Sequence, residues 1–81
     1  MENFIQPSIS VYPNPSEGIF HVQLPNDDLF LFVADIYGQN LYSRYTQEAS
    51  TIIDLSKYPK EIYILSVEGN SQKYRAKLVK K

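Results

Sequence analysis

Apolar and polar residues alternate at every second position along much of this chain. The pattern is clearest where Phe20, Val22 and Leu24 are interleaved with His21 and Gln23. Successive side chains of a β-strand point to opposite faces of a sheet, so this alternation predicts a strand with one buried face. No long segment shows the period of about 3.6 residues that marks an amphipathic helix. The chain is therefore expected to be all-β.

Segments rich in Val, Ile, Tyr, Phe and Thr predict about seven strands. They cover residues 8–12, 20–24, 29–37, 41–46, 51–55, 63–68 and 73–78. Residues 29–37 are apolar on both phases, which indicates a central strand or one covered on both faces. Its expected inward side chains are Leu31 and Val33, with Asp35 as a hydrogen-bonded polar group at its end. Residues 56–60 are expected to form a single turn of helix.

Proline and glycine interrupt these strands at short intervals. Pro13, Asn14 and Pro15 end the first strand, because proline fixes φ and lacks the N–H that a sheet ladder needs. Gly18 and Gly38 mark turns, where glycine can adopt positive φ. The strands between the turns are expected to bury Ile9, Val11, Phe20, Val22, Leu24, Tyr63, Leu65, Val67, Tyr74, Ala76 and Leu78. Together these features predict a two-sheet immunoglobulin-like β-sandwich of about seven antiparallel strands, with a small open barrel as the alternative.

The composition and charge of the chain argue against several functional classes. The 81 residues suffice for one domain, and 8 basic and 9 acidic residues give a formal net charge of -1. Such a balance provides no broad positive field for nucleic acid or for an anionic membrane. The longest apolar run, residues 29–34, is far shorter than the roughly 20 residues of a membrane-spanning helix, so no direct membrane insertion is expected. Cysteine is absent, which excludes disulfides and thiolate metal sites.

Catalytic and metal-binding chemistry finds little support in the sequence. Nucleophilic catalysis needs a base beside the nucleophile, and the only histidine, His21, lies on the outward phase of its strand. Its ordinary interpretation is an exposed surface residue. The carboxylates of Asp27, Asp28, Asp35 and Asp54 could gather around Ca²⁺, but aspartate is also common in turns because it bonds its own backbone. We therefore expect no enzyme, no metal and no cofactor.

The tyrosines leave two interpretations open. Tyr37, Tyr42, Tyr45 and Tyr58 are either ordinary half-buried residues of a sandwich or an aromatic platform. Tyrosine combines a large apolar ring with a polar hydroxyl, which suits contacts with sugars and peptides. The second interpretation would make the chain a carbohydrate- or protein-binding module of the immunoglobulin or fibronectin kind.

The C-terminal tail differs from the rest of the chain because it is both basic and aliphatic. It consists of Lys77, Leu78, Val79, Lys80 and Lys81. One interpretation is an edge strand whose lysines prevent aggregation. The other is a docking element, in which main-chain edge groups provide affinity and the flanking charges provide selectivity.

Four segments carry a resemblance to a known family when they are taken together. They are residues 11–18, which include Pro13, Asn14, Pro15 and Gly18; residues 35–41, which include Asp35 and Gly38; Leu55 and Ser56 followed by Tyr63; and the Lys-aliphatic-aliphatic-Lys sequence at 77–80. In order and spacing they resemble the motifs of the C-terminal sorting domain of the type IX (Por) secretion system, type A. Glu61 stands where the family usually has glycine, which implies either a strained positive φ at Glu61 or a turn of another form.

The resemblance implies a non-catalytic sorting domain at residues 9–81, joined by a linker at residues 1–8 to an upstream cargo domain. It implies that type IX translocon components recognise the domain in the periplasm and export it through the outer membrane. It further implies that a sortase-like peptidase then cleaves in or before the linker and that the cargo becomes extracellular or attached to the cell surface. Lys77, Leu78, Val79, Lys80 and Lys81 are the recognition residues on this interpretation.

Overall fold

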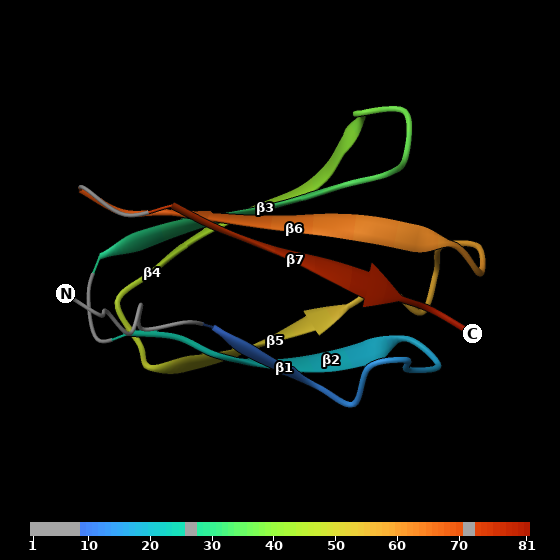
Figure 1. Ribbon diagram of the computed structural model, residues 1–81, viewed down its shortest axis with the longest axis horizontal. Helices are drawn as coiled ribbons and strands as arrows, with labels where there is room; N and C mark the ends of the chain where they lie inside the picture. The colour runs from blue at the N-terminus through green and yellow to red at the C-terminus, as the bar shows by residue number, and fades with distance from the viewer. Residues whose placement is uncertain (1–8, 26–27, 71–72) are drawn as a thin grey trace, which may run out of the picture.

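The computed structural model describes residues 9–25, 28–70 and 73–81. Within these ranges the chain forms seven strands in two antiparallel sheets that lie face to face (Figure 1). The strands are β1 (Ser10–Tyr12), β2 (Ile19–Gln23), β3 (Leu29–Ala34), β4 (Asn40–Thr46), β5 (Ser50–Asp54), β6 (Ile62–Glu68) and β7 (Lys73–Val79). The predicted all-β sandwich is confirmed. No strand of one sheet pairs with a strand of the other in these ranges, so the chain does not form the open barrel.

The order of the strands places β3 inside its sheet and β7 at an edge. One sheet has the order β1-β2-β5 and the other has the order β4-β3-β6-β7. Since β3 pairs with β4 on one side and with β6 on the other, its predicted central position is confirmed. β7 pairs only with β6 among the named strands, which makes it one of the two edges of the larger sheet.

The predicted end of the third strand is wrong. β3 stops at Ala34 rather than continuing to residue 37. Asp35 turns the chain there, because its Oδ1 accepts hydrogen bonds from the backbone N–H groups of Tyr37 and Gln39, each at 2.9 Å. An aspartate that bonds the backbone two residues further on imitates a turn and competes with the sheet ladder.

The predicted turn of helix at residues 56–60 is also absent. This segment is a turn in which the N–H of Tyr58 donates to the carbonyl of Leu55 at 3.0 Å. The carboxylate of Asp54 accepts a bond from the N–H of Ser56 at 2.9 Å, which stabilises the start of this turn. Pro59 has no N–H with which to extend the turn.

The inward faces of the two sheets form one dry core. The hydrophobic side chains that are 8% exposed or less in the described ranges are Phe20, Val22, Leu24, Leu29, Leu31, Val33, Ile53, Leu55, Tyr63, Leu65, Val67 and Leu78. This set contains the expected inward residues of β2, β3 and β6, which confirms the phase of the alternation in those strands. Ile9, Val11, Tyr74 and Ala76 are only partly buried; Val11 lies on the edge strand β1, Tyr74 and Ala76 lie on the edge strand β7, and Ile9 comes just before β1.

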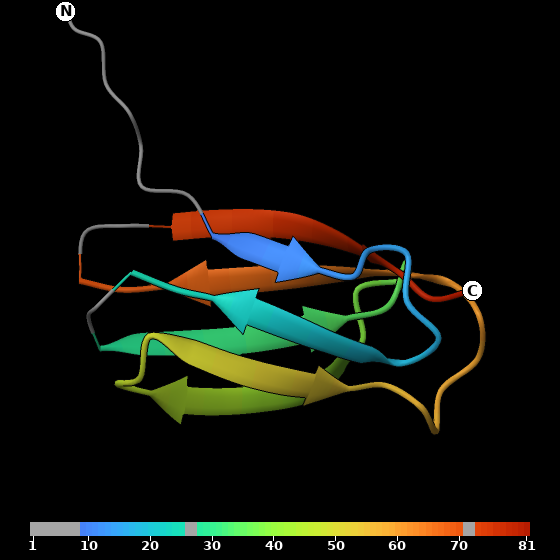
Figure 2. The same cartoon turned by 90° about the horizontal axis from the view of Figure 1, so that it is seen from below.

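Consecutive strands run in opposite directions, so the connections gather at the two ends of the sandwich. Figures 1 and 2 both show the β1–β2 loop, the β3–β4 turn, the β5–β6 loop and the chain end at the same end. We call this end, comprising residues 13–18, 35–39, 55–61 and 80–81, the motif pole. The start of β1 at Ser10 and the loop at residues 47–49 lie at the opposite end.

Candidate recognition site

The motif pole joins two segments from opposite ends of the sequence. The N–H of Ser16 donates to the carbonyl of Val79, and the N–H of Lys81 donates to the carbonyl of Ser16, both at 2.9 Å. These bonds form an isolated parallel bridge between Ser16 and Lys80. The loop that follows β1 therefore behaves as a short extra strand beside the end of β7.

Asn14 completes this junction with its side chain. Its Nδ2 donates to the carbonyl of Lys77 at 2.6 Å, and its Oδ1 accepts from the N–H of Val79 at 2.9 Å. A carboxamide carries one acceptor and two donors, so it can replace the peptide group of a neighbouring strand. The role of Asn14, between Pro13 and Pro15, is therefore to bond the edge of β7.

These contacts change the interpretation of the C-terminal tail. The edge-facing groups from the carbonyl of Lys77 to the N–H of Lys81 are already bonded to Asn14 and Ser16 within the domain. Main-chain pairing with a partner strand at this end of β7 would have to displace them. We call residues 77–79 the bonded half of β7. The backbone groups of Lys73 and Arg75 face the same way along the edge, and no hydrogen bond to these groups is recorded among the described residues, so we call this part of β7 the open half.

The five tail residues have separate roles in the structure. Leu78 is fully buried in the core, Val79 is half-buried, and Lys77 and Lys81 are exposed. The Nζ of Lys80 donates to the carbonyls of Tyr58 at 2.5 Å and Ser56 at 3.2 Å. Its ammonium group therefore connects the β5–β6 loop to the chain end. Only Lys77 and Lys81 present their charged groups to solvent without such a tie.

Gly18 and Ser56 make a close backbone approach at the same pole. The N–H of Leu55 donates to the carbonyl of Gly18 at 2.7 Å. Gly18 has a φ of 153°, and a Cβ at this position would lie 3.0 Å from the Cα of Ser56. Glycine is required here because a side chain would both strain the backbone and collide with the neighbouring segment. The opening motif and the Leu-Ser motif are thus in direct contact.

Glu61 does not carry the strain that the resemblance allowed. The only residues with positive φ in the described part of the chain are Gly18 and Gly38, so Glu61 adopts a turn of another form. Its carbonyl accepts a hydrogen bond from the N–H of Lys80 at 3.0 Å. Nearby, the hydroxyl of Tyr63 donates to the carbonyl of Pro59 at 2.5 Å, and burial raises the pKa of this hydroxyl.

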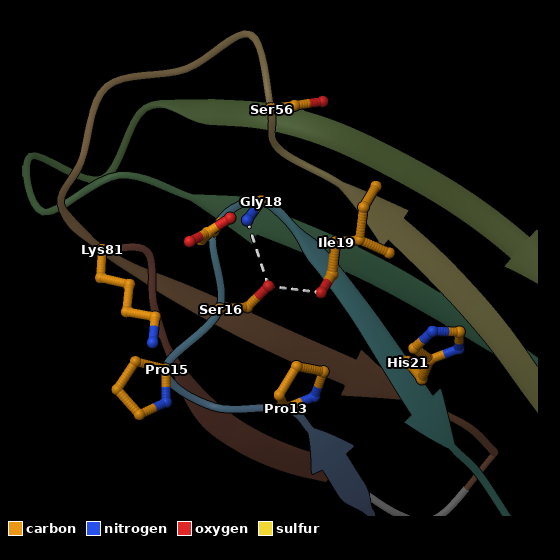
Figure 3. A pocket seen from close by; sticks show the side chains of 9 residues that line it. Pro13, Pro15, Ser16, Gly18, Ile19, His21, Ser56 and Lys81 are labelled. Carbon is orange, nitrogen blue, oxygen red and sulfur yellow. Dashed lines mark hydrogen bonds between the residues drawn. The ribbon is translucent and has the colours of Figure 1, made fainter.

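A cleft of about 540 Å³ lies on the motif pole. Its lining consists of Pro13, Pro15, Ser16, Glu17, Gly18, Ile19, His21, Ser56 and Lys81. Figure 3 shows the rings of Pro13 and Pro15 and the side chain of Lys81 along one margin, with Ser56 on the opposite side. The buried hydroxyl of Ser16 donates to the carbonyl of Ile19 at 2.5 Å and accepts from the N–H of Gly18 at 3.1 Å, and so stabilises the loop that lines the cleft.

The aspartates and the histidine take structural positions. Hydrogen bonds from the side chain and the backbone of Ser56 hold the pKa of Asp54 below its usual range. His21 is exposed, as predicted, and its ring stacks on Tyr12 at 5.5 Å. In the ranges that the structure covers, no three His, Cys, Asp or Glu side chains gather closely enough to hold a metal ion. Asp27 lies outside the described residues.

The four tyrosines do not form one platform. Tyr37 is 85% exposed in the β3–β4 turn, whereas Tyr45 contacts Phe30 on the outside of the larger sheet. Tyr58 is half-buried and packs edge-on against the buried Tyr63 at 6.4 Å. The exposed stacking of Tyr12 on His21 was missed by sequence reasoning, although the strands' pairing of these two positions explains it.

Known proteins share this fold. The chain resembles the solved structure of a DUF3244 family protein with an immunoglobulin-like β-sandwich fold from Bacteroides vulgatus ATCC 8482. The TM-score is 0.77 and the identity is 21%, over 90% of this chain and 83% of that one. This likeness defines the class of the fold as an immunoglobulin-like β-sandwich. No helix long and apolar enough to cross a membrane occurs in the described ranges.

The family follows from the sequence. The family described as the secretion system C-terminal sorting domain matches residues 10–81. The chain therefore belongs to this family: it is a non-catalytic C-terminal sorting signal domain of type IX (Por) secretion. It is also 34% identical to an ulvan lyase from Nonlabens ulvanivorans, over 89% of this chain and 14% of that protein. The chain thus spans only a small part of the length of this relative.

Proposed function

We propose that the motif pole is the surface by which type IX translocon components recognise the domain. The observation that carries the proposal is the convergence of the family motifs on one end of the sandwich. Asn14 and Ser16 bond to the tail, and Gly18 lies against Ser56. Pro13 and Pro15 line one cleft with Lys81, while Asp35, in the turn that contains Gly38, lines another with Pro59 of the β5–β6 loop. Their contacts leave Lys77 and Lys81 as the exposed charges of the tail, and the cleft lies next to Lys81.

The opposite end of the sandwich suits attachment to a cargo. β1 begins there at Ser10, so a chain that precedes residue 9 enters on the side away from the motif pole. Residues 1–8 are proposed to be the linker, and a sortase-like peptidase is proposed to cleave in or before it. The length of the lyase relative supports a domain carried by a larger secreted protein. The cargo would pass through the periplasm and become extracellular or attached to the cell surface.

Export of a reporter tests the function as a whole. Residues 1–81 are fused to the C-terminus of a periplasmic reporter and expressed in a host that has a type IX system. The reporter is expected in the medium or on the cell surface. A folded fusion that stays in the periplasm would overturn the proposal.

Point substitutions test the surface without removing the last strand. Deleting residues 77–81 removes the buried Leu78, so a loss of export would also follow from unfolding. Reversing the exposed charge in Lys81→Glu leaves the core intact and is expected to slow export several-fold. The matched control is Arg44→Glu, an exposed charge reversal on β4. Equal export of both variants would exclude Lys81 from recognition.

A further inference from the structure

The outer face of the larger sheet is unusually apolar. Phe30 is 50% exposed on β3, and its ring contacts Phe32 at 6.4 Å and Tyr45 at 5.0 Å. Ile62 at the start of β6 and Ile36 in the β3–β4 turn are 41% and 58% exposed. An antiparallel sheet with one solvated face normally presents polar residues on that face. These side chains are therefore candidates for contact with something outside the domain.

A row of positive charges borders this face. Lys73, Arg75 and Lys77 alternate with the inward residues of β7, so all three lie on the outer side of the sheet. Arg75 pairs in register with Ser66 of β6, and Lys73 with Glu68. No ion pair to any of the three cations is recorded in the described part of the chain. The row is a local feature, because the whole chain has a net charge of -1.

A cleft connects the apolar residues with the cations. It has a volume of about 480 Å³ and is lined by Ala34, Asp35, Ile36, Gly38, Ile64, Ser66 and Arg75. Figure 1 shows that the β3–β4 turn rises from the larger sheet on the side away from the smaller one, so the turn forms a wall beside the sheet. The Oδ1 of Asp35 already accepts two backbone N–H groups. The cleft thus has apolar sides and one unpaired cation at Arg75.

We propose that this face, defined by Phe30, Phe32, Ala34, Ile36, Ile62, Ile64 and Tyr45 with the cations of β7 at its margin, docks a partner protein of complementary chemistry. The partner places an apolar side chain in the cleft and acidic groups opposite Lys73 and Arg75. The inference rests on the proposed function only in that the partner belongs to cells with a type IX system. It adds a second contact surface to the motif pole.

Two other occupants fit the chemistry less well. A second copy of the chain facing this sheet would place either another cation row or the outer side chains of β4, Ser43 and Tyr45, against the cations. The outer carboxylate of β6, Glu68, is already the cross-strand neighbour of Lys73 in its own chain. An anionic membrane would attract the cations, but a flat surface does not fill the concave cleft. An acidic protein surface with one protruding apolar residue satisfies both features.

Photo-crosslinking in intact cells tests the contact directly. A photoreactive amino acid replaces Ser66 in the cleft of the exported fusion, and Ser50 on the exposed face of the smaller sheet in the control. A single protein adduct is expected from position 66, absent from position 50, and lost when Lys73→Glu and Arg75→Glu are added. Adducts of equal yield at both positions, or an adduct that survives the charge reversal, would overturn the proposal.

The rate of export separates this inference from the proposed function. The double variant Lys73→Glu and Arg75→Glu is expected to be exported about tenfold more slowly than the wild type, because like charges would face each other across the interface. The single variant Arg44→Glu is expected to match the wild type. A wild-type fusion that is not exported contradicts the proposed function. Normal export of the double variant, without an adduct at position 66, contradicts only the docking face.

A membrane is distinguished with lipid vesicles. The purified domain is mixed with vesicles that contain phosphatidylglycerol and phosphatidylcholine in equal parts, and co-sedimentation is measured at low and high salt. No co-sedimentation is expected. Salt-sensitive binding that is lost in the double variant would assign the face to a membrane and overturn the proposed protein partner.

Discussion

The two halves of β7 use the same backbone in opposite ways. In the bonded half, Asn14 and Ser16 occupy the edge-facing groups between Lys77 and Lys81. In the open half, Lys73 and Arg75 present charges, and their edge-facing groups are not recorded in any bond in the described ranges. The comparison teaches that one edge strand can be protected by a loop at one end and by charge at the other. Charged side chains on an edge discourage pairing with other strands.

The largest expected effect comes from the core beneath the bonded half. Tyr63 lies opposite Leu78 in the β6–β7 register and is 1% exposed. Tyr63→Ala is expected to lower the free energy of unfolding by about 3–5 kcal/mol, enough to unfold much of a domain of this size. Tyr74 is only half-buried and lies in the open half, so Tyr74→Ala is expected to lower the free energy of unfolding clearly less. Urea unfolding followed by circular dichroism compares them, and equal losses would remove the distinction between the halves.

Gly18 tests the loop that carries Asn14 and Ser16. In Gly18→Ala the new Cβ would lie 3.0 Å from the Cα of Ser56 on a backbone with positive φ, so both collision and strain arise. We expect a loss of about 1–3 kcal/mol in the free energy of unfolding. Gly38→Ala is the matched control, because Gly38 also has positive φ but has no atom within 4 Å of the added Cβ. A larger loss for Gly38→Ala would contradict the close approach of Gly18 and Ser56.

Asn14 tests the bonded half directly. Asn14→Ala removes the donor and the acceptor that bond the edge of β7. It is expected to lower the free energy of unfolding by about 1–2 kcal/mol. Hydrogen exchange by NMR should show faster exchange at the N–H of Val79, with no change at the N–H of Arg75. Asn40→Ala, which removes only an exposed side-chain bond to Ser43, serves as the control. Unchanged exchange at Val79 would mean that Asn14 does not protect the edge.

The smallest effect concerns pH at the motif pole. The pKa of Asp54 is lowered in the folded chain by its bonds from Ser56, so the unfolded chain binds a proton more readily. The resulting stabilisation is fully present above the unfolded pKa of about 3.9 and is lost as the pH falls below it. Asp54→Asn should therefore flatten the acid limb of a plot of stability against pH. An unchanged acid limb would assign the acid sensitivity to other carboxylates.

The sequence predicts the parts of this structure that depend on local alternation. Buried residues occupy every second position of β2 and β6, as Phe20 and Val22 or Tyr63 and Leu65 show. This alternation is visible in the sequence alone. The end of β3 was missed because apolar residues continue past Ala34, while the side chain of Asp35 bonds the backbone ahead of it. A polar contact of this kind overrides the hydrophobic pattern.

The sequence identified residues of the candidate site, but it did not show which of them contact one another. The motifs identified Asn14 and Lys77, but their side-chain to backbone bond joins residues 63 positions apart, and no spacing rule connects them. The tail was expected to offer a main-chain edge, because a basic aliphatic strand at the end of a sheet is typical of one. Only the three-dimensional position of the 13–18 loop shows that this edge is already occupied.

The junction between Ser16 and Lys80 has a consequence for the order in which the domain assembles. The loop at residues 13–18 can acquire its partner only after residues 79–81 have been synthesised, so the motif pole cannot form on a shorter nascent chain. Before residues 62–68 have been synthesised, Leu29–Ala34, an uncharged apolar stretch without proline, lacks the strand β6 that covers one of its edges. Such segments self-associate when left unpaired, so nascent or truncated chains would depend on chaperones far more than the finished domain does.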